Sequence, residues 1–118
     1  MKHKRKKIIF AMKRVPSPRD IRRLAQGDVP PFLQDKPFIV MRYSVSARFI
    51  DESAFQWGLY LSPEDGDSAR IDRKTALSII HANGMSLAHS EKCGQIYELP
   101  ERPFHATYCR EARLRRAS

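Results

Sequence analysis

The sequence is poor in cysteine, with only Cys93 and Cys109 among 118 residues. Two cysteines cannot build the dense disulfide framework of small secreted domains, so a disulfide scaffold is excluded. We therefore expect both thiols to be free, in a reducing, cytosol-like compartment.

Long apolar runs are missing as well. The apolar segment near the start, Ile8 to Met12, is followed at once by Lys13 and Arg14. A secretory signal needs a longer apolar region and a small-residue cleavage site, and a membrane helix needs about 20 apolar residues. We expect no signal peptide, no membrane partner and a cytoplasmic location, or a nuclear one in a eukaryotic host.

The sequence also lacks the local signatures of common enzymes. It contains no G-x-S-x-G, P-loop, G-x-G-x-x-G, H-E-x-x-H or C-x-x-C motif, each of which marks a particular reaction or cofactor. Cys93 beside Lys92, with His89 and Glu98 nearby in sequence, could act in catalysis, but such a grouping arises easily by chance. We predict a protein with no enzymatic activity and no cofactor.

Positive charge, in contrast, is abundant and unevenly distributed. The net charge is +9, and residues 1–23 alone hold ten Lys or Arg against the single acid Asp20. Residues 24–109 carry a net charge of −3, and residues 110–118 carry +3. Because the cations gather at the two ends of the chain, we expect those ends to bind a polyanion.

We divide the chain into a flexible basic arm (residues 1–14), a single α+β domain (residues 15–109) and a basic tail (residues 110–118). The predicted function is that of a small nucleic-acid-binding accessory protein, without catalysis. It would contact the phosphate backbone of DNA or RNA with low sequence specificity. The residues predicted to contact nucleic acid are Lys2, Lys4, Arg5, Lys6, Lys7, Lys13, Arg14, Arg19, Arg22, Arg23, Arg113, Arg115 and Arg116.

The mildly acidic middle of the chain supports an alternative function. Its most acidic stretch is Glu64-Asp65-Gly66-Asp67, which could face a basic protein surface. The chain would then be a protein-interaction module, an inhibitor or adaptor of a nucleic-acid-processing complex, and an origin in a phage or mobile element would suit it. A third possibility is a structural component of a ribonucleoprotein or capsid.

The first half of the domain carries signals for a helix and a β-hairpin. Ser17-Pro18-Arg19-Asp20 is typical of a helix start with a capping box, and Gly27 is a stop signal. Residues 38–50 alternate strictly, with the odd positions from Ile39 to Phe49 apolar, which predicts a half-buried strand. Residues 55–61 alternate again and complete an antiparallel hairpin, in which Gly58 would mark a bulge.

The second half repeats this order. Asp72 can cap a helix over Arg73 to Asn83, with Ala76, Leu77, Ile79 and Ile80 on its buried side. Residues 87–99 predict a second hairpin that turns at Lys92-Cys93-Gly94. The fold class is therefore α+β: a small antiparallel sheet of two hairpins packed against one or two helices, with flexible basic arms at both ends.

Two further surfaces could bind nucleic acid. Lys74, Ser78 and His81 share one face of the second helix, which could enter a groove; we expect this face to be a solvated helix side. Four aromatic residues could form a stacking platform for single strands, but we expect them in the core. They are Tyr43, Phe55, Trp57 and Tyr60.

A metal site is the remaining candidate. His89-x₃-Cys93 and His105-x₃-Cys109 repeat one spacing, and His81 lies close in sequence. Two imidazoles and two thiolates could hold zinc, but this order departs from the usual zinc modules, and four residues along a strand separate two side chains by about 13 Å. We predict no metal site.

Overall fold

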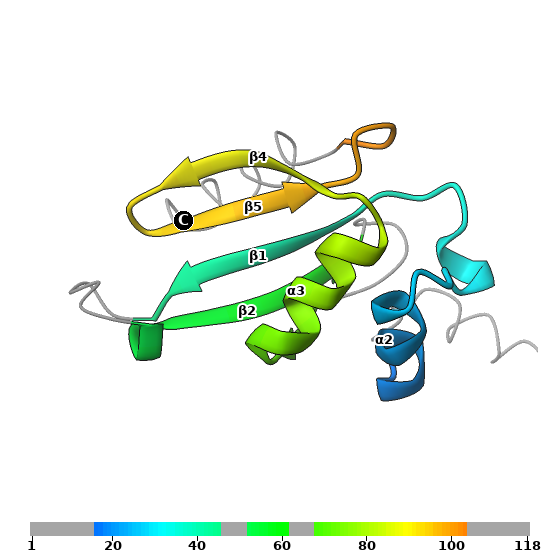
Figure 1. Ribbon diagram of the computed structural model, residues 1–118, viewed down its shortest axis with the longest axis horizontal. Helices are drawn as coiled ribbons and strands as arrows, with labels where there is room; N and C mark the ends of the chain where they lie inside the picture. Colours follow the sequence, from blue (N-terminus) through cyan, green and yellow to red (C-terminus); the bar gives the residue numbers. More distant parts are fainter. Residues whose placement is uncertain (1–15, 46–51, 62–67, 104–118) are drawn as a thin grey trace, which may run out of the picture.

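The computed structural model describes residues 16–45, 52–61 and 68–103. They form one five-stranded antiparallel sheet with one α-helix, Arg73–Ala82, against one face and a second, Pro18–Ala25, packed beside the first (Figure 1). The predicted α+β class is confirmed. The basic arms, residues 1–14 and 110–118, lie outside the described residues.

Both predicted hairpins are present, and they join into one sheet through the pairing of β1 with β5. The order across the sheet is β3-β2-β1-β5-β4. The strands are β1 (Phe38–Ser44), β2 (Phe55–Leu61), β3 (Ser68–Ile71), β4 (Ser86–Glu91) and β5 (Gly94–Glu98). The helices are α2 (Pro18–Ala25) and α3 (Arg73–Ala82), with short 3₁₀ turns at Pro31–Leu33 and Glu52–Ala54.

Helix α2 begins with the predicted capping box. The Asp20 amide donates to the Ser17 hydroxyl over 3.1 Å, and the Ser17 amide donates to the Asp20 carboxylate over 3.4 Å. Gly27, with φ of +82°, follows the end of the helix. A Cβ atom at this position would lie 3.2 Å from the Ala82 carbonyl oxygen, so glycine lets the end of α2 approach α3 closely.

Helix α3 also begins and ends where the sequence predicted. The Asp72 carboxylate accepts a 2.7 Å hydrogen bond from the Thr75 amide. Hydrogen bonding from the Thr75 side chain, together with this amide, holds the pKa of Asp72 below its ordinary value. At the other end, the Asn83 side-chain amide donates to the carbonyl oxygens of Leu24 and Ile79, each over 2.9 Å. One side chain therefore ties the C-terminal ends of the two helices together.

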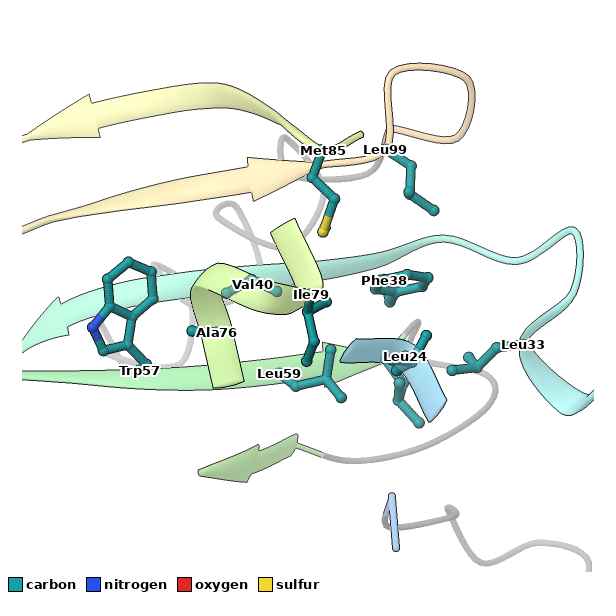
Figure 2. Close-up of a cluster of buried hydrophobic side chains, with 11 residues drawn as sticks. Leu24, Leu33, Phe38, Val40, Trp57, Leu59, Ala76, Ile79, Met85 and Leu99 are labelled. Carbon is teal, nitrogen blue, oxygen red and sulfur yellow. The ribbon is translucent and has the colours of Figure 1, made fainter. Parts of the chain in front are cut away.

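The core lies between the helices and the sheet (Figure 2). Leu24 of α2 and Ile79 of α3 are fully buried against side chains of the central strands. The core residues are Leu24, Leu33, Phe38, Val40, Trp57, Leu59, Leu61, Ala76, Ile79, Met85 and Leu99. In β2 the predicted inward residues Trp57, Leu59 and Leu61 are all buried.

The predicted inward face of β1 is wrong. The even-numbered Phe38 and Val40 belong to the core beneath the helices, so Ile39, Met41 and Tyr43 point to the opposite face. The reason is that residues 38–41 are all apolar, and alternation identifies the buried face only where the other face is polar. Ile39, like Phe38 and Val40, has no exposed surface.

Three local predictions also need correction. Gly58 pairs regularly with Met41 and Arg70 and forms no bulge; the irregularity lies in β4, between Leu87 and His89. Leu77, placed on the buried side of α3 by its sequence, is 40% exposed. Strand β3 was not predicted, because its four residues were too short a run to stand out beside the acidic stretch.

Candidate functional site

The described part of the predicted phosphate-contacting surface lies on α2. Arg19 and Arg22 are exposed on this helix, whose inner side carries the buried Leu24. The only acid of the helix is Asp20, whose carboxylate accepts a hydrogen bond from the Ser17 amide in the capping box. Its negative charge also interacts favourably with the positive end of the helix dipole. Helix α2 therefore presents two guanidinium groups to solvent.

Arg23, the third arginine of α2, has a partner within the chain. Its guanidinium donates to both carboxylate oxygens of Asp28, over 2.9 and 3.2 Å. This hydrogen bond lowers the pKa of Asp28 and raises the pKa of Arg23. Because Arg23 is held by Asp28, it is a weaker candidate for a phosphate contact than Arg19 and Arg22.

The other ten predicted contact residues lie outside the described residues. They are Lys2, Lys4, Arg5, Lys6, Lys7, Lys13, Arg14, Arg113, Arg115 and Arg116. Seven of them belong to the segment that leads into α2 in the sequence.

The outer face of α3 is placed as the sequence predicted. Lys74 and His81 are exposed and Ser78 is half-buried, consistent with a solvated helix side. The buried side of the helix is Ala76 and Ile79.

The four aromatic residues do not form one platform. Trp57 is buried in the core on the helix side and stacks with Tyr97, with 6.2 Å between ring centroids. Phe55 shares that side by strand alternation. Tyr43 and Tyr60 lie on the opposite face, where Tyr43 donates a 3.2 Å hydrogen bond to Gln56.

The described half of the candidate metal site is a hydrogen-bonded cluster at the β4–β5 turn. The His89 Nε2 atom lies 2.6 Å from one Glu91 carboxylate oxygen, and the Cys93 thiol donates to the other over 3.2 Å. Among residues 16–45, 52–61 and 68–103, no group of three metal-ligating side chains is placed to hold an ion. His105 and Cys109 lie outside the described residues. Cys93 is exposed and forms no disulfide bond.

A small pocket that the sequence did not indicate lies where β2, β3 and the start of α3 meet. It has a volume of about 230 Å³ and is lined by Phe55, Gln56, Trp57, Arg70, Ile71, Asp72 and Arg73. Within the described part of the chain, the Trp57 indole N–H is a buried donor without a hydrogen-bond partner. The pocket could not be predicted because its wall depends on β3, although the alternation Ser68-Ala69-Arg70-Ile71 is a weak signal for that strand.

The described helices are all too short or too polar to cross a lipid bilayer. No family model, curated protein or solved structure matches this chain.

Proposed function

We propose that this protein binds nucleic acid through its phosphate backbone, using the basic arms and the exposed side of α2, and that it catalyses no reaction. The observation that carries the proposal is the charge distribution. Ten of the 22 Lys and Arg residues lie in residues 1–23 against one acid, and this charge continues onto the folded domain at Arg19 and Arg22. Cationic segments of this kind gain affinity by releasing counterions from the polyanion.

The packing of α2 supports its part in the proposal. The helix is fixed by the fully buried Leu24 and by the Asn83 hydrogen bond. The carboxylates of its acid Asp20 and of the neighbouring Asp28 accept hydrogen bonds within the chain. Arg19 and Arg22 are thus held on a rigid element, so binding would cost less ordering entropy there than along a disordered segment.

A matched pair of charge reversals tests the role of α2. Arg22→Glu should weaken binding to duplex and single-stranded DNA and to RNA by a similar factor, because a phosphate contact carries no sequence information. The control is Lys92→Glu, which makes the same change of charge at the exposed β4–β5 turn, at the other end of the molecule from α2 (Figure 1).

Fluorescence anisotropy of labelled oligonucleotides would measure both variants. Loss of affinity in Arg22→Glu but not in Lys92→Glu supports the proposal. Equal effects in the two variants would mean that only net charge matters and that α2 is not the contact surface. Absence of binding by the unmodified chain at low salt would contradict the function itself.

A second candidate function, a protein-interaction module, is favoured by strand β4. This edge strand has five exposed residues of six, and its Leu87 is 53% exposed. Among the described residues β4 pairs only with β5, and a sheet edge with an exposed apolar side chain can accept a strand from another protein. Stoichiometric capture of one protein that survives nuclease treatment, and is lost on Leu87→Asp, would favour this function over direct nucleic-acid binding.

A further inference from the structure

We infer that the pocket at the junction of β2, β3 and α3 holds one unstacked base of a single-stranded nucleic acid, with the adjoining phosphate at Arg70 and Arg73. The inference rests on the proposed function and deepens it, because phosphate contacts alone do not distinguish single strands from duplexes.

The walls of the pocket suit a planar, partly apolar group. Phe55 and Trp57 come from β2 and Ile71 from the end of β3. The Arg42 guanidinium lies 3.6 Å from the centre of the Phe55 ring and also donates to Gln95 over 2.8 Å. Arg42 does not itself line the pocket; its contact restricts the motion of the Phe55 ring, which does. A braced aromatic wall favours base stacking because it loses little freedom on binding.

One polar group at the pocket wall suits the edge of a base. The Trp57 indole N–H is buried without a partner, and such a donor gains from any acceptor that reaches it. Gln56 also borders the pocket, but its side chain points to the opposite face of the sheet, where it accepts the hydrogen bond from Tyr43, so it is not available to the base. At about 230 Å³, the pocket is smaller than the roughly 300–1,000 Å³ of sites for drug-sized ligands, so it would take a single ring system.

Charge at the rim favours a phosphate beside that base. Arg70 and Arg73 are both exposed there, and Lys74 follows them on α3. Asp72 supplies the carboxylate among the described lining residues. It accepts a hydrogen bond from the Thr75 amide at the start of α3, and this hydrogen bond partly offsets its repulsion of a phosphate. Guanidinium groups are well suited to phosphate oxygens. Among the described residues that line the pocket, two arginines against one carboxylate make the rim cationic.

The sole tryptophan of the chain makes the test direct. A ligand in the pocket must alter Trp57 fluorescence, whereas a ligand held only by the arms or α2 must not. Titration of the full chain with a labelled single-stranded oligonucleotide would follow anisotropy and Trp57 emission together. The comparison ligands are an abasic oligonucleotide of the same length, a duplex and a poly-glutamate peptide.

We expect binding of the base-bearing strand to change Trp57 emission, and binding of the abasic strand and the duplex to leave it unchanged. Phe55→Leu, which keeps an apolar side chain but removes the ring, should weaken binding of the base-bearing strand roughly tenfold and leave the abasic strand unaffected, since stacking on one aromatic side chain has about this effect. The matched control is Tyr43→Leu, on the opposite face of the sheet, which should change neither.

The other outcomes separate the two proposals. Binding seen by anisotropy with identical Trp57 emission for base-bearing and abasic strands overturns the pocket and leaves the function standing. No binding of any nucleic acid overturns the function. A Trp57 response to poly-glutamate alone would make the pocket a protein contact and also overturn the inference. The comparison of base-bearing and abasic strands needs no variant, so it remains decisive if Phe55→Leu fails to fold.

Discussion

Asn83 is the residue whose replacement most directly tests how α2 is held on the domain. Its side-chain amide donates to Leu24 at the end of α2 and to Ile79 within α3, each over 2.9 Å, from a half-buried position. Asn83→Ala removes both hydrogen bonds and leaves the backbone of the helix end unchanged. We expect a less stable protein in which α2 is more loosely attached.

The structure sets the size of this effect. Each carbonyl keeps one backbone partner, since the Gly27 amide donates to Leu24 and the Asn83 amide donates to Ile79. Neither oxygen is therefore left wholly unsatisfied, and the loss is that of two ordinary hydrogen bonds rather than a full desolvation penalty. Two bonds near the lower end of the range give about 1–2 kcal/mol, which lowers the Tm of a domain of this size by roughly 4–16 °C.

Thermal unfolding followed by circular dichroism would measure the change, with Asn83→Asp as a second variant. This variant points a carboxylate at two carbonyl oxygens, so the folded protein raises the pKa of the new group above its unfolded value of about 3.9. Its extra instability is present above the raised pKa and disappears as the pH falls below about 3.9. A Tm unchanged in Asn83→Ala, or an Asn83→Asp deficit that grows on acidification, would refute this account of the helix junction.

Further predictions concern the cap of α3, a close backbone contact and the core. Asp72→Ala should lower the Tm at neutral pH, because the hydrogen bonds from Thr75 depress the pKa of Asp72 below 3.8. The difference in Tm from the unmodified protein should shrink as the pH falls below that value, which thermal unfolding at several pH values would show. Gly94→Ala should prevent stable pairing of β5 with β1, because the new methyl group would overlap the Arg42 carbonyl oxygen; soluble yield and circular dichroism would report the loss. Leu24→Ala should cost roughly 2–5 kcal/mol in urea unfolding, since Leu24 is fully buried, and a loss below about 1 kcal/mol would place α2 outside the cooperative core.

Capping residues and period-two patterns made much of the fold predictable. Ser17 with Asp20 and Asp72 with Thr75 are local interactions, so a few neighbouring residues were enough to place the start of each helix. The alternation of Phe55, Trp57, Leu59 and Leu61 likewise gave β2 and its buried face.

Features set by tertiary contacts could not be predicted. The apolar run at residues 38–41 did not reveal which face of β1 lies under the helices, because that choice depends on where α3 packs. Gly58 resembled a bulge, yet a Cβ there would lie 2.7 Å from the Tyr60 ring, so glycine makes room for that side chain.

The candidate site likewise has features that the local sequence predicts and features that depend on tertiary contacts. The exposure of Arg19 and Arg22 follows from the amphipathic pattern of α2, and the charge counts required only the sequence. The ion pair that holds Arg23 depends on how the chain turns after α2 to bring Asp28 near. The pocket depends on β3, which pairs with the middle of β2 and brings Arg70 beside Phe55 and Trp57.

The salt dependence of binding tests the central claim most directly. Affinity for duplex DNA, measured by anisotropy at several salt concentrations, should fall with a log–log slope of about −0.9 for each phosphate contacted, or roughly −7 if about eight phosphates are engaged. Removal of residues 1–14, which hold seven of the chain's Lys and Arg residues, should make that slope much shallower and weaken binding severely, with the remainder due to α2 and the basic tail. A slope near zero for the full chain, or one unchanged by the removal, would contradict nucleic-acid binding through the basic arms.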